Sequence, residues 1–338
     1  MRTDLPPITL RSWIDTGSLL MKIRRQGTYL DRSIMPLVKP FAEEAGTNLT
    51  SKQVRKIRDY YGLGVPAMLG EAICALRGMK MTEPERMASS CQGAITGIFD
   101  DFFDEEYLTD NEVLKLIETD TLPADAPASQ RLFVCLHNLA KKHMAAPGLM
   151  HNYWPGVFDG QAASRRQEGA LPPGNELREI MLLKGGTSLR FFRSAFGLCS
   201  EAEDRFLYAL GGMVQFTNDI FDVYKDLQAG VHTLVTTTSH IAPIRNELLH
   251  TLQGMYQAFK MSGIESRRLI ACTRILSMGT FCRAMVCLDQ LEQAEARHGG
   301  IFNPAACTRK ELICDMELWP NRFSALRYHT YLVDMLTS

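Results

Sequence analysis

Apolar residues recur along most of the chain at intervals of three and four positions, the spacing of one helix face. Long runs of alternating β-branched residues, which would indicate strands, do not occur in the sequence. The pattern predicts an all-α protein, and the lack of a clear linker or fixed-period repeat favours one domain over residues 1–338. The expected helices cover residues 10–26, 50–60, 66–77, 82–106, 110–117, 130–144, 175–183, 188–196, 201–228, 242–260, 264–297 and 309–335.

Local signals mark several helix boundaries. Thr82 followed by Glu85 three positions later predicts a capping box, and Asp110 is expected to cap the next helix. Residues 145–174 are rich in proline, glycine and aromatic residues, so we expect a long connection there. A connection of this length inside a compact domain more often carries function or additional helices than nothing.

A narrow polar stripe runs along the helix predicted within residues 210–234. Wound at about 100° per residue, its polar side chains fall in a stripe about 120° wide, and most of the remaining surface is apolar. Oxygen ligands on a rigid helix suit a hard cation such as Mg²⁺, whereas the alternative is an exposed acidic strip with an internal ion pair. The stripe contains Gln215, Asn218, Asp219, Asp222, Lys225 and Asp226.

A second acidic group ends the helix that starts near Thr82. Carboxylates at a helix C-terminus oppose the helix dipole, so the group lowers stability unless a cation offsets it. A solvated acidic helix end is the simpler interpretation, but Phe99, Phe102 and Phe103 are interleaved with the acids and disfavour it. Together the two strips predict a polynuclear Mg²⁺ site for a multiply charged anion such as a diphosphate. The acids of this second group are Asp100, Asp101, Asp104 and Glu105.

Composition limits which binding partners and which cellular compartment we expect. The formal net charge of −1 gives no electrostatic reason to expect nucleic acid. Nine cysteines without a Cys-x-x-Cys pair argue against a disulfide framework and favour a reducing compartment. The N-terminus is too polar for a secretory signal and no uninterrupted apolar run approaches transmembrane length, so we expect a cytoplasmic protein without stable membrane insertion.

These motifs resemble those of the class I isoprenoid synthase superfamily, whose members are all-α bundles around a deep apolar cavity. The string DDFFDE, residues 100–105, resembles the first aspartate-rich motif of that family. NDIFDVYKD, residues 218–226, resembles the second motif of terpene synthases, with Asp222 where Ser or Thr is usual. The wider string around it is similar to a squalene and phytoene synthase motif, and LLKGGTSLRFF resembles the helix break of chain-elongating prenyl synthases. We therefore expect a kink or a close backbone approach at Gly185-Gly186.

The resemblance implies a set of functional residues. Asp100, Asp101 and Asp104 would hold two Mg²⁺ ions, and Asn218, Asp222 and Asp226 a third. Charge on the leaving diphosphate would be stabilised by cationic residues, and a dry aromatic wall would surround the carbocation. The candidates for substrate binding are Arg178, Lys184, Lys225, Arg327, Tyr328, Phe99, Phe103, Phe192, Phe216 and Gly186, with plain core packing as the alternative for each aromatic ring.

The sequence also departs from the family pattern. After Asp104 it lacks the arginine pair of chain-elongating enzymes, and Arg24-Arg25-Gln26-Gly27 matches their isopentenyl diphosphate site poorly. The expected activity is therefore ionisation and cyclisation of one prenyl diphosphate. The alternatives are a prenyl transferase, by squalene-type coupling or chain elongation, and a non-catalytic protein that binds isoprenoid diphosphates. A homodimer is compatible with the sequence.

Overall fold

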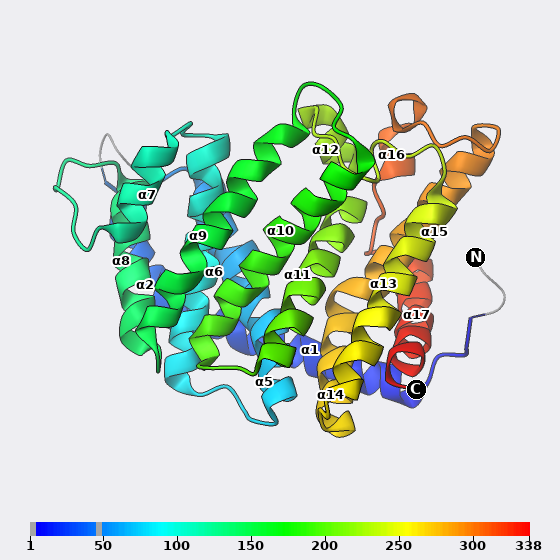
Figure 1. Ribbon diagram of the computed structural model, residues 1–338, viewed down its shortest axis with the longest axis horizontal. Helices are drawn as coiled ribbons and strands as arrows, with labels where there is room; N and C mark the ends of the chain where they lie inside the picture. Colours follow the sequence, from blue (N-terminus) through cyan, green and yellow to red (C-terminus); the bar gives the residue numbers. More distant parts are fainter. Residues whose placement is uncertain (1–4, 45–48) are drawn as a thin grey trace. The chain divides into compact units, whose positions relative to one another are not determined.

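The computed structural model describes residues 5–44 and 49–338, and over these residues the protein is helical with no strand (Figure 1). One isolated antiparallel bridge joins Glu168 and Val231. The predicted all-α fold class is confirmed. The helices are α1 (Leu10–Tyr29), α2 (Met35–Ala42), α3 (Ser51–Arg55), α4 (Gly62–Gly64), α5 (Glu71–Arg77), α6 (Glu83–Asp104), α7 (Asp110–Glu118), α8 (Ala128–His143), α9 (Pro147–Ser164), α10 (Gly174–Arg193), α11 (Glu201–Phe221), α12 (Val223–Ala229), α13 (Ile241–Met261), α14 (Ser266–Leu276), α15 (Cys282–Arg297), α16 (Arg309–Leu312) and α17 (Trp319–Thr337).

Short π and 3₁₀ segments extend or join these helices. The π segments are η1 (Leu30–Ile34), η2 (Lys56–Tyr61), η3 (Val65–Gly70) and η6 (Ser277–Phe281), and the 3₁₀ segments are η4 (Arg165–Gln167), η5 (Ser194–Phe196) and η7 (Pro304–Ala306). Segments η2 and η3 link α3, α4 and α5 into one helical run. Segment η6 does the same for α14 and α15.

The chain divides into two compact units, each assembled from separate stretches of sequence. Unit 1 comprises Met1–Gly17, Ala163–Leu189 and Ser200–Ser338, and unit 2 comprises Ser18–Ala162 and Arg190–Cys199. The single domain expected from the sequence stays a prediction.

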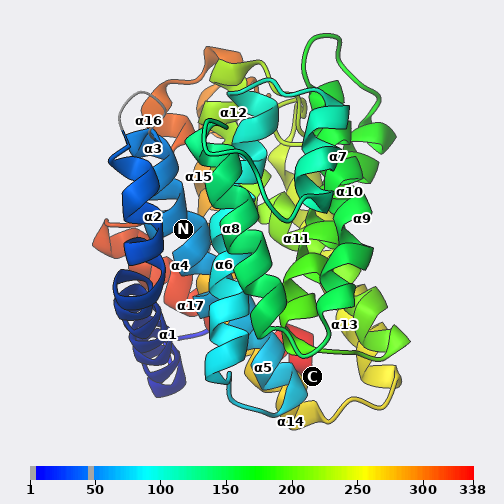
Figure 2. The same cartoon turned by 90° about the vertical axis from the view of Figure 1, so that its left-hand side faces the viewer.

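In unit 2, α6 is the central helix. It runs beside α8 in both views and also packs against η2 and η3 (Figures 1 and 2). The capping box predicted at its start is present, because the Thr82 side chain accepts from the Glu85 backbone N–H and the Glu85 side chain accepts from the Thr82 N–H. Most side chains from Ala88 to Phe103 are buried, which explains why this helix carries apolar residues on nearly every face.

In unit 1, helices α10 and α11 cross at glycines on both sides. A Cβ atom built on Gly185 would lie 2.2 Å from the Gly211 carbonyl oxygen, and one on Gly211 would lie 2.2 Å from the Gly185 oxygen. The two backbones are therefore in direct contact, as the Gly-Gly pair predicted. The expected interruption is wrong, because α10 continues through Gly185-Gly186 as regular helix. Packing against α11 removes the need for a kink.

Other boundaries also differ from the expectations. Residues 145–174 are not simply a connection, since they contain α9 with its buried Trp154. Thr109 rather than Asp110 caps α7, with a capping box to Glu112. The helix expected at 309–335 is two helices, α16 and α17, with Pro320 in the first turn of the second.

One helical stretch among the described residues, Ser266–Arg297, is long and apolar enough to cross a membrane on length and composition alone. Its most apolar window is 67% buried within the protein, as is typical of a core helix.

Candidate functional site

The acidic stripe of unit 1 lies where α11 ends and α12 begins. The helix expected at 201–228 is broken at Asp222, which ends α11 and precedes α12 with φ −91° and ψ 9°. The backbone bonds nevertheless continue, because the Asp222 N–H donates to Asn218 O at 2.9 Å and the Asp226 N–H to Asp222 O at 2.8 Å. The three predicted ligands thus remain one turn apart despite the break.

Asp219 is the buried acid of this stripe, and the sequence-based ligand set omitted it. Only 6% of its surface is exposed, and Gln215 Nε2 donates to its Oδ1 at 2.8 Å. Burial, with further contributions from Asp226 and Asp222, raises the pKa of Asp219 to about 7. The signal available in the sequence was its position in the same stripe as Asn218.

Asp226 is a second acid of this stripe with a raised pKa. Burial, followed by repulsion from Asp222, raises the pKa of Asp226 to about 7. Two cations partly offset these charges. Lys225 Nζ lies 3.2 Å from Asp222 Oδ2, and Lys184 on α10 lowers the pKa of both raised carboxyls. Lys184 and Lys225 thus lie close enough to offset part of the negative charge of these three carboxylates.

The glycine contact between α10 and α11 explains how Lys184 reaches this region. Close approach of the two backbones at Gly185 and Gly211 brings the residue before Gly185 towards the polar face of α11. Gly186 faces α11 as well, since a Cβ there would lie 2.5 Å from the Tyr208 ring. The observed role of Gly186 is helix packing, and the predicted contact with substrate stays a prediction.

The acidic group of unit 2 is held by residues from η2. Asp101 is 1% exposed, and one of its oxygens forms an ion pair with Lys56. Tyr61 Oη donates to Asp100 Oδ2 at 2.6 Å, while Asp104 is exposed. The second Asp101 oxygen, Oδ2, is buried without a hydrogen-bond partner. A buried carboxylate oxygen of this kind is what a metal ion or a water would satisfy.

Two glycines on α6 allow η2 to come this close. A Cβ on Gly93 would lie 2.6 Å from Tyr61 O, and one on Gly97 would lie 3.0 Å from Lys56 Cβ. Gly93 and Gly97 are one turn apart and precede Asp100 and Asp101 by a further turn, so all lie along one side of the helix. No local pattern in the sequence distinguishes Lys56 or Tyr61, because only tertiary packing places them beside the acids.

Aromatic rings fill the interior of unit 2 next to these acids. The ring centroids of Phe99 and Phe103 are 5.2 Å apart, and Trp154 lies 5.1 Å from Phe99 and 4.5 Å from Phe191. Phe192 is 5.8 Å from Phe191. Three predicted wall residues of unit 2 therefore belong to one aromatic cluster, whose centre is Trp154, a residue outside the predicted set.

The remaining predicted residues have structural partners elsewhere in unit 1. Arg178 forms a two-point ion pair with Glu247, with nitrogen–oxygen distances of 2.5 and 2.8 Å. Arg327 donates to the backbone oxygens of residues 5 and 6. Tyr328 Oη donates to Asp289 Oδ1 at 2.6 Å, and Phe216 is fully buried. Their predicted contacts with substrate stay predictions, as does the meeting of the two acidic strips.

Both strips suit a divalent cation, though neither is a preformed cage. Among the described residues, the cluster of three ligand-type side chains with donor atoms within 4.8 Å of one another lies elsewhere, at His298, Cys307 and Glu311. Mg²⁺ rarely uses an all-protein cage, and is usually bound by one or two carboxylates together with waters and substrate phosphates. The unpaired Asp101 oxygen and the raised pKa values of Asp219 and Asp226 fit that type of site.

Comparisons with known proteins add one structural similarity. No protein-family model matches the sequence, and no curated protein matches it. One similar solved structure is entitled "Crystal structure of a dehydrosqualene synthase in complex with ligand". The match covers 94% of this chain and 99% of the other chain, with 12% sequence identity and a TM-score of 0.45.

Proposed function

We propose that this protein is a Mg²⁺-dependent class I terpene synthase, which ionises one allylic prenyl diphosphate and cyclises or rearranges the carbocation. The observation that carries the proposal is the set of three carboxylates at Asp219, Asp222 and Asp226. Burial of Asp219 and Asp226, followed by repulsion among the three acids, holds the pKa values of these two carboxyls at about 7, and a bound cation would offset their negative charge.

Each strip has a role in this proposal. Asn218, Asp222 and Asp226 would hold one Mg²⁺, and Asp100, Asp101 and Asp104 would hold two more. When bound, the ions supply positive charge that lowers the barrier for departure of the diphosphate. Lys184 and Lys225 add fixed positive charge on the unit 1 strip, where the leaving group would gain the electron pair of the broken carbon–oxygen bond.

The aromatic cluster of unit 2 suits the other product of ionisation. A carbocation is stabilised by the negative faces of aromatic rings and is destroyed by water. Phe99 and Phe103 are at most 3% exposed and follow Gly97 on the same helix as Asp100 and Asp101. We propose that part of this cluster borders the substrate and excludes water, while the rest is core.

A prenyl transferase is the second candidate, favoured by a cationic cleft in unit 2. The cleft has a volume of about 570 Å³ and contains four arginines, with Arg86 at its buried end. Arg86 precedes Asp100 by 14 positions on α6, which corresponds to about 21 Å along the axis. In coupling or elongation the reacting carbon of each substrate lies close to its own diphosphate. A second diphosphate bound at Arg86 would lie about 21 Å from the acids that would hold the first, too far for the two reacting carbons to meet. The distance between the cleft and Asp100 therefore favours the one-substrate reaction. The lining residues are Met21, Arg24, Arg25, Thr28, Tyr29, Arg32, Ser33, Glu83 and Arg86.

Turnover of prenyl diphosphates of increasing length, with Mg²⁺ and product analysis by mass spectrometry, tests the proposal. Asp100→Ala and Asn218→Ala should each abolish turnover while the helical circular dichroism is unchanged. A chelator should abolish the activity of the wild type, and added Mg²⁺ should restore it. Substantial activity in either variant would refute the proposed metal-binding role of the strip to which the changed residue belongs.

The same assay separates the two candidates. A one-substrate reaction depends hyperbolically on one prenyl diphosphate, is not stimulated by isopentenyl diphosphate, and keeps the carbon count of its substrate. A product of doubled carbon count, or one lengthened by isopentenyl diphosphate, would establish the transferase. Binding of prenyl diphosphate without turnover would instead support a non-catalytic binding protein.

A further inference from the structure

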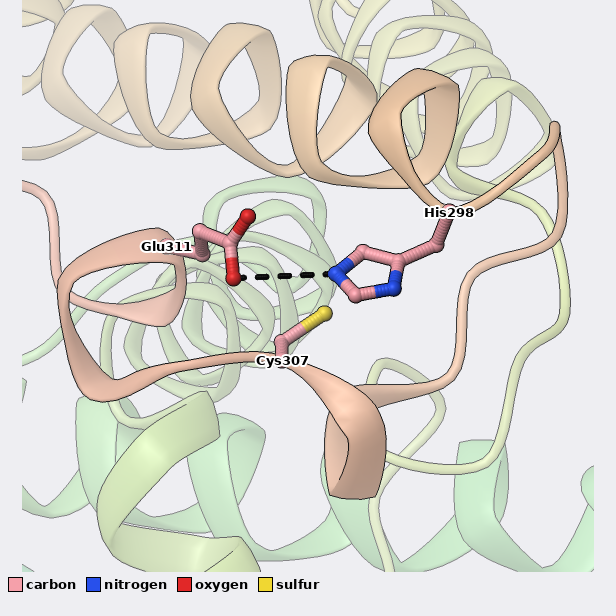
Figure 3. Close-up of side chains that lie close together, drawn as sticks. All are labelled: His298, Cys307 and Glu311. Carbon is pink, nitrogen blue, oxygen red and sulfur yellow. Dashed lines mark ion pairs between the residues drawn. The ribbon is translucent and has the colours of Figure 1, made fainter.

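Three side chains of metal-ligand type meet at the connection from α15 to α16 in unit 1 (Figure 3). His298 directly follows α15, Cys307 follows η7, and Glu311 lies in α16. Their donor atoms all lie within 4.8 Å of one another, and His298 Nε2 is 3.6 Å from Glu311 Oε2. Zinc bonds of about 2.0–2.3 Å in a tetrahedron place donor atoms roughly 3.3–3.8 Å apart, so shifts of about 1 Å complete the geometry.

The backbone around these residues is well anchored. Gly299 and Gly300 have φ values of 76° and 84°, which reverse the chain directly after His298. The Phe302 N–H donates to Ser239 O at 2.8 Å, and its ring is buried. From α15, Gln290 Nε2 donates to three backbone oxygens of residues 310–313 at 2.9–3.1 Å. These bonds hold α16 against the end of the helix that carries His298.

Hydrogen bonds also orient the carboxylate. Thr308 donates to Glu311 Oε2 from its N–H at 2.8 Å and from its hydroxyl at 2.9 Å, and these bonds keep the pKa of Glu311 below its usual range. Arg297 Nε lies 3.2 Å from the other oxygen. Metal-binding carboxylates are commonly fixed by such outer partners. A metal on Oε2 would replace the hydroxyl bond and leave the backbone bond in place.

We propose that His298, Cys307 and Glu311 form a Zn²⁺ site with three protein ligands and a fourth position open to solvent. Imidazole, thiolate and carboxylate together suit zinc, whereas Mg²⁺ prefers oxygen ligands alone, so this site is chemically distinct from the acidic strips. The proposal is independent of the proposed function. The occupied site joins the end of α15 to α16, where Arg309 stacks over the Tyr224 ring of α12 at 5.8 Å.

The test is zinc binding to the full chain, purified with a reductant and without a chelator. Metal content is measured by mass spectrometry, and affinity by competition with a chromophoric chelator. Cobalt substitution reports the thiolate through its ligand-to-metal absorption in the near ultraviolet. Cys307→Ser and His298→Gln remove ligands, whereas Cys135→Ser and His250→Gln change an exposed cysteine and an exposed histidine outside the site.

Glu311→Gln separates metal binding from helix capping, because glutamine at this position preserves the capping box. We expect one zinc per wild-type chain and in both controls, and a loss of affinity of at least about 100-fold in the three ligand variants, beyond the usual effect of losing an outer partner. The cobalt–thiolate absorption should vanish in Cys307→Ser. Zinc uptake that persists in Cys307→Ser, or no uptake by the wild type, would overturn the proposal.

Discussion

Replacing Asp219 by asparagine should stabilise the protein at neutral pH, although Asp219 belongs to the carboxylate group of the proposed metal site. Its pKa is about 7 in the folded protein and 3.8 in the unfolded chain. The folded state therefore holds a proton that the unfolded state has already released, so stability falls as pH rises from 3.8 to 7. Each pKa unit corresponds to about 1.4 kcal/mol, which gives a cost of up to about 4 kcal/mol above pH 7. Asparagine keeps an oxygen to accept the Gln215 hydrogen bond and carries no charge.

Urea denaturation at pH 5 and pH 8, without divalent metal, measures this effect. At pH 5 most of the cost is not yet present, so the advantage of Asp219→Asn over wild type should grow by up to about 3 kcal/mol between the two pH values. Asp125→Asn changes an exposed aspartate of a loop and should leave the pH dependence unchanged. Millimolar Mg²⁺ should raise wild-type stability at pH 8 more than that of the variant. An advantage that is absent at pH 8, or equal at both pH values, would refute the argument.

Three further predictions concern a close helix contact, a buried ion pair and a buried histidine. Gly211→Ala places a Cβ 2.2 Å from a backbone oxygen of α10 and should lower the free energy of unfolding by at least about 2 kcal/mol. The control Gly254→Ala, which has open space in α13, should raise it by about 1 kcal/mol. Chemical denaturation measures both changes. Asp289→Ala removes one ion-pair partner of Arg245, which is 1% exposed and keeps its pair with Glu292, and should lower the unfolding free energy by about 1–3 kcal/mol. Burial lowers the pKa of His137 from 6.5 to about 4, so the unfolded chain takes up this proton first and stability falls by up to about 3 kcal/mol as pH drops from 6.5 to 4. His137→Gln should remove that slope in pH-dependent unfolding.

Some features of this protein follow from short-range chemistry and were therefore predictable. Helical periodicity, the capping box at Thr82 and the one-turn spacing of Asn218, Asp222 and Asp226 all depend on residues within four positions of one another. Such relations involve only neighbouring residues, so they can be predicted from the sequence without knowledge of tertiary contacts.

The tertiary structure decided what those local patterns mean. Gly185-Gly186 reads as a helix break, yet α11 supplies a neighbour so close that only glycine fits and α10 stays intact. Asp219 looks like any other polar residue of the stripe, and only its burial distinguishes it. Lys56 reaches Asp101 because Gly97 leaves room for η2, and these two charged residues are 45 positions apart in the sequence. Burial and proximity between distant segments depend on the packed chain, which is why periodicity predicted the helices but not the surroundings of their charged groups.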